Sequence, residues 1–445
     1  MRDFIYHAAW IFILPVTLAS AHLGVSVWIW VALLPPNELM YGRLGIVLPF
    51  NKLVAASAFF ALVTSQTKKD FYADKLMMLI VAYGIIVTLS YVLSPYDLSF
   101  SDLQYDKFWK ELVLFFLITG VMFSQHRLHQ VALVVSLAFG FVMVKEGIIF
   151  LLTAGGHKIE AIGTVGDNNG VAMALLMTIP LLLYCAKYSA DRWVRLGMYV
   201  TAGFGTVTVV ATYSRGGFIG LLVLGLMLLK GSKYKVRALV AVGVLAMVLF
   251  ALMPENYLDR IGTISDATSD DSFAIRLLAW KINYLMAVDH PFLGNGLYAS
   301  LNWQNWSAHL GEATTWLFPS PLVLKTFVAH SIYFQVLGDT GFVGLFLFVS
   351  VLLTALFKTI QTQRIVRRDP ALEWSGDLAR ATQMSLAIYC VSGAALSLVY
   401  FELLYILLAM ISRNHRTAAQ LATPQQVTRG SFVPSRRVPA YARTA

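Results

Sequence analysis

Long runs of apolar residues alternate along this chain with short polar or basic turns. Many of the runs reach the length of about 18 residues that a helix needs to cross a hydrocarbon core of roughly 30 Å. A bilayer admits only helices and closed barrels, and the strands of a barrel alternate apolar with polar positions. Because the runs are continuous, the pattern predicts an all-α polytopic membrane protein with about twelve transmembrane helices.

The first apolar stretch leaves two topologies open. It covers about residues 4–35 and contains Pro15 and a polar break at Ser20–His22, so it fits either one kinked span or a tight hairpin. The further spans are expected at about 48–64, 75–94, 107–124, 128–153, 168–187, 196–213, 218–230, 238–253, 330–357, 381–395 and 399–412.

The longest polar interval divides the chain. We expect an N-terminal transmembrane bundle at 1–253, a polar loop with an amphipathic helix at 254–329, and C-terminal transmembrane helices at 330–412. Residues 413–445 are polar and rich in Thr, Gln, Arg and Pro, and they are expected to form a disordered tail.

Composition agrees with the membrane class and orients the chain. Of 445 residues, 58% are hydrophobic and 13% are charged, whereas soluble domains carry about 25% charged residues. The net charge of +10 would suit a nucleic-acid-binding protein, but most Lys and Arg residues fall in short turns on one side of the predicted spans. Such a bias marks the cytoplasmic side. The net charge therefore reflects the topology of the chain, and no nucleic-acid partner is expected. We expect the C-terminus on the cytoplasmic side and the long loop on the outer side.

No cofactor or metal site is predicted. Cys185 and Cys390 lie inside apolar runs and indicate neither a disulfide framework nor metal-ligand spacing. Asp266, Asp270 and Asp271 could hold a divalent cation, but without further clustered acidic residues a solvated loop is favoured. The first helix is expected to stay uncleaved, because no small-residue cleavage site follows it.

Arg215 is the sharpest single signal for function. It lies at the expected outer end of a span, and an arginine inside an apolar protein is costly unless it faces a cavity or a partner. Its guanidinium suits bidentate binding of phosphate oxygens, and Gly216 and Gly217 allow a ligand to approach the backbone closely. The alternative is an arginine that extends to lipid headgroups.

Three further candidates lie in or next to the long loop. Arg276 belongs to an amphipathic run, where position alone slightly favours an exposed surface charge. The segment 290–296 (HPFLGNG) reads as a helix stop, and its Gly-x-Gly is rejected as a nucleotide site. His330, at the outer end of a span, could act as a general base or be a hydrogen-bonded interfacial residue. Asp339 lies further into the same predicted span than His330. The alternative to a functional role is that it is a buried partner for a cationic side chain.

Two polar groups occur near the middle of the N-terminal bundle. Lys145 and Glu146 are adjacent within a span, so each is expected to need its own partner or a water-filled cavity. They could line an ion path, but a structural ion-pair network is preferred. Asp167, Asn168 and Asn169 are mainly the cap of the following helix, with contacts to a ligand as the alternative.

The order of several motifs resembles the superfamily of O-antigen ligases and O-antigen polymerases. The motifs are Ser214–Gly217 (SRGG), Arg276–Trp280 (RLLAW), His290–Gly296 (HPFLGNG), His330–Ser331 and Gly338–Gly341 (GDTG). The opening MRDFIYHAAWIFILP, the pair Gly155-Gly156 and the stretch Asp167–Asn169 resemble more narrowly the O-glycosylation ligase branch found in exopolysaccharide systems.

The resemblance implies a GT-C-type glycosyltransferase of the bacterial inner membrane with its active site facing the periplasm. Such enzymes transfer a glycan from undecaprenyl pyrophosphate to an acceptor hydroxyl, which in the ligases belongs to lipid A–core, and no metal or other cofactor is expected. By motif, Arg215 and Arg276 would bind the donor pyrophosphate and His330 would be the catalytic base. Supporting contacts are expected from Ser214, Gly216, Asp167, Asn168, Asp339 and Lys145.

Two positions depart from the family pattern. Ser331 follows the histidine where many members have Asn, and Asp339 stands where Glu is frequent. Both substitutions concern polar contacts around the site, and both leave the histidine in place.

Three other functions compete with the ligase interpretation. A polymerase would use the same donor with a second lipid-linked glycan as acceptor, and a protein O-oligosaccharyltransferase would use a secreted protein. A polysaccharide transporter is suggested by Lys145 and Glu146, but the chain lacks the repeats of many transporters and has a long polar loop on one side alone.

Overall fold

The structure is a computed structural model that describes residues 2–36, 49–66, 68–96, 99–162, 165–231, 271–315, 325–367 and 369–422. Within those ranges the chain is helical and contains no β-strand, so the predicted all-α class is confirmed there. The predicted span at about 238–253 lies outside the described residues.

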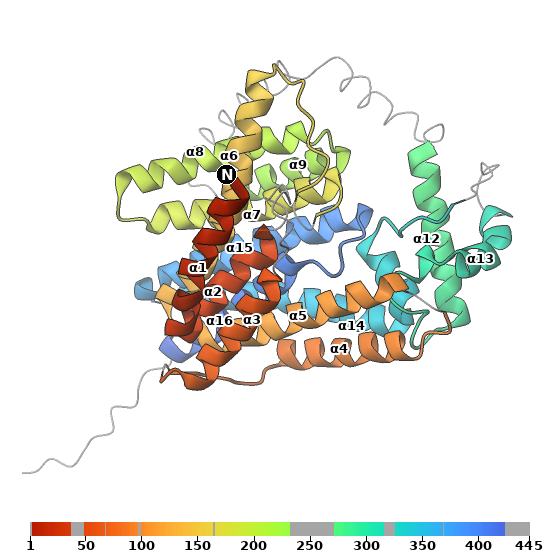
Figure 1. Cartoon of the computed structure of the whole chain (residues 1–445), viewed down its shortest axis with the longest axis horizontal. Helices are drawn as coiled ribbons and strands as arrows, with labels where there is room; N and C mark the ends of the chain where they lie inside the picture. Colours follow the sequence, from red (N-terminus) through yellow and green to blue (C-terminus); the bar gives the residue numbers. More distant parts are fainter. Residues whose placement is uncertain are drawn as a thin grey trace, which may run out of the picture.

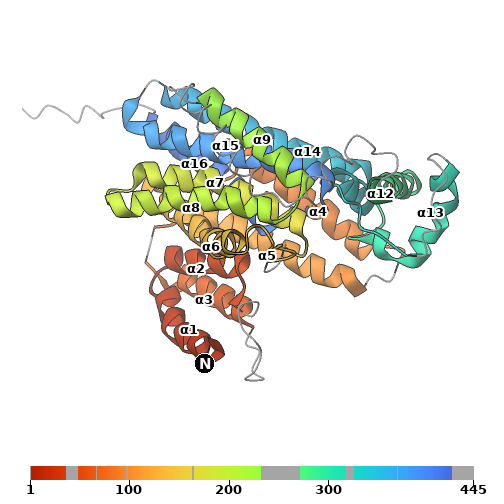
Figure 2. The same cartoon turned by 90° about the horizontal axis from the view of Figure 1, so that it is seen from above.

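The helices form one bundle (Figure 1). They are α1 (Arg2–Ala19), α2 (Ala21–Leu33), α3 (Phe50–Thr64), α4 (Lys75–Val92), α5 (Ser99–Val121), α6 (Gln125–Leu152), α7 (Asn168–Tyr188), α8 (Arg192–Ala211), α9 (Arg215–Gly231), α12 (Asp271–Asp289), α13 (Trp303–Thr315), α14 (Ile332–Val366), α15 (Glu373–Ser392) and α16 (Glu402–Ala422). Short 3₁₀ turns lie at Ala299–Leu301 (η2), Pro370–Leu372 (η3) and Gly393–Ala395 (η4). Figure 2 shows α1, α2 and α3 grouped along one edge, with α12 and α13 at the far end of the bundle.

Five of the described helices are long and apolar enough to cross a membrane, namely α4, α6, α7, α8 and α14. Helices α2 and α3 are apolar but shorter. These helices support a membrane-embedded protein with several spans, while the number of twelve stays a prediction.

The first apolar stretch forms two helices. Ser20 adopts an extended conformation with φ −162° and ψ 148°, which ends α1 and starts α2. The two helices contact each other, and Gly24 lies so close to the main chain of Thr17 that a Cβ there would be 2.9 Å from the Thr17 carbonyl oxygen. The break at Ser20 therefore separates two packed helices rather than kinking one.

Helix α7 is the central helix of the bundle. Its side chains are buried along nearly its whole length, and it contacts α6, α8, α9 and α15. A helix that is apolar on all sides suits such an enclosed position. Its N-terminus is capped by Asp167, whose carboxylate accepts hydrogen bonds from the amides of Asn169 and Gly170 at 2.8 and 3.0 Å. The buried body of α7 thus holds Asp167 and Asn168 in one defined place.

Two helices begin several residues earlier than the apolar pattern predicts. Helix α5 begins at Ser99 and α15 at Glu373, and polar residues in these early turns form ion pairs with other segments. Lys107 of α5 lies 3.1 Å from Glu402, and Lys187 of α7 lies 2.7 Å from Glu373. Such pairs between distant segments are invisible to a hydropathy pattern.

The last helix extends into the predicted tail. The sequence places the start of a disordered tail at Arg413, whereas α16 continues to Ala422. Arg413 is fully buried and donates to the carboxylate of Asp70 at 2.6 Å and to its main-chain carbonyl at 3.0 Å. This ion pair compensates the buried charge of Arg413, and α16 continues past the position where the tail was expected to begin. Residues 423–445 lie outside the described part of the chain.

Candidate functional site

The corner between α8 and α9 carries Ser214 and Arg215. Tyr213 has a positive φ of 54°, so the chain reverses sharply after α8, and its hydroxyl donates to the carbonyl of Gly155. The Oγ of Ser214 accepts from the amide of Gly217 at 2.9 Å and so caps α9. Arg215 is therefore the first residue of α9, at the positively polarised end of the helix.

The same corner is tied to the start of α7. The Ser214 hydroxyl donates to Oδ1 of Asn169 at 2.6 Å, and the side-chain amide of Asn168 donates to the main-chain carbonyl of Thr212 at 2.8 Å. Asp167–Asn169 and Ser214–Arg215 thus form one polar unit in which the N-termini of α7 and α9 lie together. The N-terminus of α9 with its arginine is suited to bind an anion, whereas the N-terminus of α7 is already capped by the carboxylate of Asp167.

The two glycines after Arg215 differ in their surroundings. A Cβ on Gly217 would lie 2.8 Å from the Cβ of Ala172, so this glycine permits the contact between α9 and α7. A Cβ on Gly216 would meet nothing closer than the Oγ of Ser214 at 3.7 Å. The backbone of Gly216 is therefore open beside Arg215.

His330 lies in the segment that leads into α14 and has a positive φ of 47°. Its imidazole is half-buried, and burial lowers the pKa of this group. The positive charge of Arg276 lowers the pKa further, and the negative charge of Asp167 acts in the opposite direction. Both charges are therefore close enough to act on His330. The Asp167 carboxylate before α7 and the Arg276 guanidinium in α12 thus act electrostatically on His330, and the lowered pKa favours the neutral imidazole, which can accept a proton.

The sequence analysis missed Ser397. Its Oγ accepts a hydrogen bond of 2.7 Å from the main-chain amide of His330, and its carbonyl accepts from the Tyr298 hydroxyl at 3.3 Å. It belongs to the irregular segment 396–401, whose Leu398 also contacts the start of α7 at Gly170. Non-helical backbone within a membrane protein marks a site enclosed by protein. The signal that could have found it is the Ser-Gly pair at 392–393, which interrupts the apolar run.

Asp339 is placed in the scaffold of this region. It is buried, and its carboxylate accepts from the amide of Tyr298 at 2.8 Å and the hydroxyl of Tyr400 at 3.2 Å. Its partners are thus an amide and a phenol rather than a cationic side chain. Through Tyr298 and Tyr400, it holds η2 and the segment 396–401 against α14.

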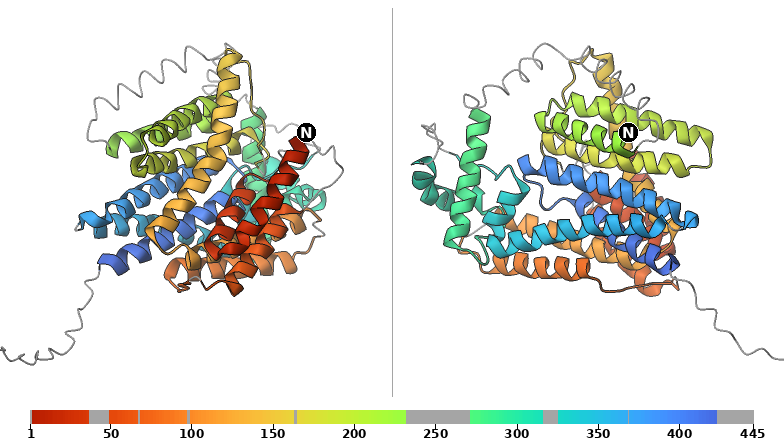
Figure 3. Two further views of the ribbon diagram at one scale, coloured as in Figure 1. Left: turned by 60° about the vertical axis from the view of Figure 1, so that its left-hand side comes forward. Right: turned by 180° about the vertical axis from the view of Figure 1, so that it is seen from behind.

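The motif at 290–296 docks onto the same part of α14. The main-chain amide of Asn295 donates to the carbonyl of Gly338 at 3.1 Å, and the main-chain amide of Phe342 donates to the carbonyl of Pro291 at 2.8 Å. Gly294 and Gly341 both have φ +68°, and a Cβ on either would collide with the facing main chain. The two glycine-containing motifs therefore serve one close contact, which holds α12 across the end of α14 (Figure 3).

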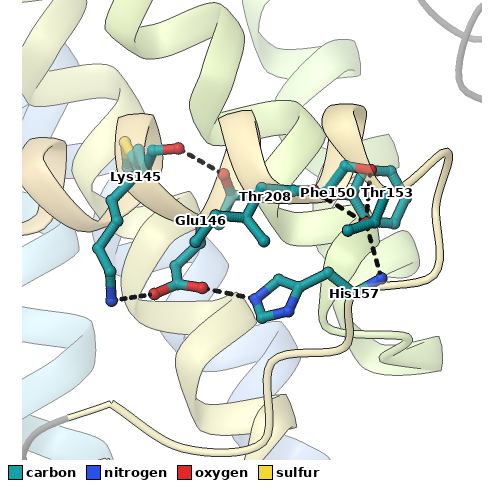
Figure 4. Close-up of polar contacts among 8 residues, drawn as sticks. Lys145, Glu146, Phe150, Thr153, His157 and Thr208 are labelled. Carbon is teal, nitrogen blue, oxygen red and sulfur yellow. Dashed lines mark hydrogen bonds and ion pairs between the residues drawn. The ribbon is translucent and has the colours of Figure 1, made fainter.

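Lys145 and Glu146 pair with one another, in contrast to the expectation that each needs its own partner (Figure 4). Lys145 Nζ lies 2.8 Å from Oε1 of Glu146, because a long flexible side chain can reach an adjacent residue. Oε2 of Glu146 lies 2.6 Å from Nε2 of His157. Lys145 is 57% exposed, whereas Glu146 is 12% exposed. The contact between Glu146 and His157 holds the loop after α6, which carries Gly155, whose carbonyl accepts from the Tyr213 hydroxyl.

The fold and these contacts define a helical membrane-embedded protein with a polar site built at the N-termini of α7 and α9, beside His330. Residues 200–349 match the family model described as O-antigen ligase, and this segment includes Arg215, Arg276 and His330. Residues 1–190 match a family of unknown function (DUF5935). No curated protein matches the chain. The chain therefore carries a domain of the O-antigen ligase superfamily, which indicates a ligase or polymerase type of function.

Proposed function

We propose that this protein is an O-antigen ligase of the bacterial inner membrane with the GT-C type of fold, acting at the periplasmic face. It transfers a glycan from undecaprenyl pyrophosphate to a hydroxyl of lipid A–core. The observation that carries the proposal is that His330 is bonded to Ser397 in the segment 396–401, whose Leu398 contacts the start of α7, in a chain whose residues 200–349 match the O-antigen ligase family. Membrane lipids would surround the spans, and the donor's lipid tail would lie between them.

The donor pyrophosphate would bind to Arg215 and Arg276. The N-terminus of α9 adds partial positive charge at the same place. Ser214 and Asn168 support this assignment because their hydrogen bonds fix the corner that carries Arg215, and the backbone of Gly216 next to it is open. Charge that develops on the leaving pyrophosphate would be stabilised most where such groups are already oriented.

His330 would act as the general base. Its neutral imidazole would take the proton of the acceptor hydroxyl while the hydroxyl oxygen bonds to C1 of the donor sugar. The bond between C1 and the pyrophosphate oxygen breaks, and undecaprenyl pyrophosphate leaves with the electron pair. Attack from the face opposite the leaving group inverts the anomeric centre. Asp167 would stabilise the imidazolium that forms, while Asp339 and Lys145 would act through the surrounding scaffold.

Transfer by purified protein tests the proposal. The protein would receive undecaprenyl-pyrophosphate glycan and lipid A–core in detergent, with EDTA present. A shifted lipopolysaccharide band is expected. A ladder of longer lipid-linked glycans would show a polymerase, glycan on an added secreted protein would show a protein O-oligosaccharyltransferase, and movement of glycan without a new bond would show a transporter. Loss of transfer on adding EDTA would contradict the metal-independent mechanism.

A further inference from the structure

Helix α12 presents apolar side chains on two of its faces. One face packs against α13, and its buried residues are Leu278, Ala279, Ile282, Leu285 and Met286. The other face is open and carries Phe273, Tyr284 and Val288, each at least 38% exposed. Their spacings are close to whole turns of about 3.6 residues, so the three side chains form one row along the helix. A helix surrounded by water has a polar outer face, and a second apolar face therefore calls for a second apolar environment.

The exposed row of α12 joins an exposed row of α14. Helix α14 is long and apolar enough to cross a membrane, and the row on its surface consists of Phe342, Phe346, Leu353 and Phe357. In a membrane span such a row contacts the lipid tails. The ring of Tyr284 meets the ring of Phe342 edge to face, with 6.4 Å between the ring centroids. The open face of α12 is therefore continuous with a surface that contacts lipid.

Helix α12 lies across the end of α14, with α4 beside α14 (Figures 1 and 3). The contact between Gly294 and the main chain of α14 fixes this crossing, and Trp280 stacks on Phe334 of α14 with 5.2 Å between the ring centroids. Helices α4 and α14 are both candidate spans, whereas α12 is not among those found in the described part of the chain. A helix that crosses the end of a span lies along the membrane surface rather than through the membrane.

A lysine lies at the edge of the exposed row. The Nζ atom of Lys281 is 5.3 Å from the centroid of the Tyr284 ring, which is within the range of a cation–π contact. Aromatic rings with an adjacent lysine are typical of the membrane interface, where the ring lies at the level of the headgroups and the ammonium group reaches the lipid phosphates. The charge beside the row thus suits a phospholipid better than an apolar protein surface.

We propose that α12 is an interfacial helix whose exposed face binds the bilayer leaflet around the first turns of α14. Phe273, Tyr284 and Val288 enter the boundary between headgroups and acyl chains, and Lys281 contacts lipid phosphates. Two observations select lipid as the occupant of this face. The face continues the lipid-contacting row of α14, and a cation lies at its edge.

Binding of α12 to the leaflet would set the depth of Arg276. This residue lies one turn after Phe273 in the same helix. The donor assigned above is itself a lipid, and its pyrophosphate lies at the level of the headgroups. An anchored α12 would hold the guanidinium of Arg276 at that level. This consequence rests on the proposed function, whereas the contact of α12 with lipid does not.

Nitroxide labels measure the surroundings of the exposed face directly. Full-length protein with Cys185→Ala and Cys390→Ala would carry one added cysteine at a time, in nanodiscs of phosphatidylethanolamine and phosphatidylglycerol. The test sites are Tyr284→Cys and Val288→Cys. Electron paramagnetic resonance would compare collisions of each label with oxygen, which concentrates in hydrocarbon, and with a water-soluble nickel chelate.

Two reference sites calibrate the measurement. Phe346→Cys lies in the exposed row of α14, and Ala308→Cys lies on the exposed surface of α13. The ratio of oxygen to nickel collisions at positions 284 and 288 is expected to exceed the ratio at 308 and to stay below the ratio at 346. A ratio equal to that at 308 would place the face in water. Labels that neither reagent reaches would show that protein covers it, and either result would overturn the proposal.

A charge on the exposed face provides an independent test. Val288→Asp is expected to shift the collision ratio of a label at 284 toward the ratio at 308, whereas the matched Val288→Leu keeps it. Neither variant removes a core contact, because Val288 is exposed. An unchanged ratio in Val288→Asp would contradict the contact of α12 with lipid.

The kinetics of Val288→Asp test the depth of Arg276 separately. Without the labels, this variant is expected to raise KM for the lipid-linked donor several-fold with little change in kcat, whereas Val288→Leu keeps both. A wild-type KM in Val288→Asp would refute the positioning of Arg276 by the membrane. Absence of transfer by the wild-type protein would instead refute the proposed function, and the label measurements would decide the lipid contact without it.

Discussion

The main-chain amide of His330 donates a 2.7 Å hydrogen bond to the side-chain oxygen of Ser397, 67 residues further along the chain. His330 has a φ of 47°, a left-handed conformation that costs a non-glycine residue of the order of 1–3 kcal/mol. Surrounding contacts must compensate such a conformation. The bond to Ser397 is one of them, and it fixes the backbone from which the imidazole projects.

Replacement of Ser397 tests this relationship. Ser397→Ala removes a hydrogen bond worth about 1 kcal/mol, so the transfer rate should fall roughly three- to tenfold. Ser397→Thr keeps the hydroxyl and should keep most of the rate. Rates would be compared at equal amounts of folded protein, judged by gel filtration. A wild-type rate in Ser397→Ala would show that the bond is dispensable for positioning His330.

The groups assigned to the reaction should be needed for transfer and not for folding. Arg215→Ala, Arg276→Ala and His330→Ala are each expected to abolish transfer while leaving expression intact, because they remove the pyrophosphate contacts or the base. Arg215→Lys should remain strongly impaired, since an ammonium group cannot replace bidentate contacts. The readout is the lipopolysaccharide band in cells that lack the wild-type protein. Normal transfer by His330→Ala would eliminate the general-base role.

Two charges near His330 should shift the pH dependence in opposite directions. The base acts in its neutral form, so transfer falls as the pH drops through the pKa of His330. Arg276 lowers this pKa, and Arg276→Gln, although inactive in transfer, should therefore raise the pKa of the imidazole, as followed by NMR titration. Asp167 raises it, and Asp167→Asn should move the limb to lower pH.

Asparagine also caps helices well, so Asp167→Asn preserves the start of α7 and serves as its own structural control. The measurement is the transfer rate across acidic and neutral pH. An acidic limb that coincides in wild type and Asp167→Asn, together with an unchanged imidazole pKa in Arg276→Gln, would refute the assignment of this titration to His330.

Substitution of each of the two glycines after Arg215 should distinguish an effect on helix packing from an effect on the approach of the donor. Gly217→Ala places a Cβ against Ala172 and should lower the free energy of unfolding by about 1–3 kcal/mol. Gly216→Ala meets no close atom and should leave the thermal unfolding temperature unchanged or higher, because alanine favours helix. If the donor approaches the backbone there, Gly216→Ala should raise KM for the donor. An unchanged KM would place the pyrophosphate elsewhere.

The ion pairs of α6 should matter through Glu146 rather than Lys145. Lys145 is largely exposed, and exposed ion pairs contribute about 0–1 kcal/mol. Lys145→Gln should therefore transfer glycan within about twofold of wild type. Glu146→Gln weakens the contact to His157, so it should loosen the loop that carries Gly155 and slow transfer more. A severe loss in Lys145→Gln alone would favour an ion path through α6.

The sequence by itself determined the helical class, because continuous apolar runs leave the backbone no hydrogen-bond partners in a bilayer except its own. It also determined which residue types could carry the chemistry. An arginine at a span end and a histidine before a span are unusual in an apolar chain, and their order around one polar loop resembles one superfamily. The start of α7 could also be predicted from the sequence, because Asp167 directly precedes the apolar run and aspartate is a good helix N-cap.

The tertiary structure alone decided which of these groups meet. Asn169 and Ser214 lie 45 residues apart, and His330 and Ser397 lie 67 residues apart, yet each pair shares a hydrogen bond. It also assigned Asp339 to the scaffold and paired Arg413 with Asp70 across the bundle. Local pattern specifies which face of a helix is apolar, but contacts between distant segments depend on how those faces pack, and packing is a property of the whole chain.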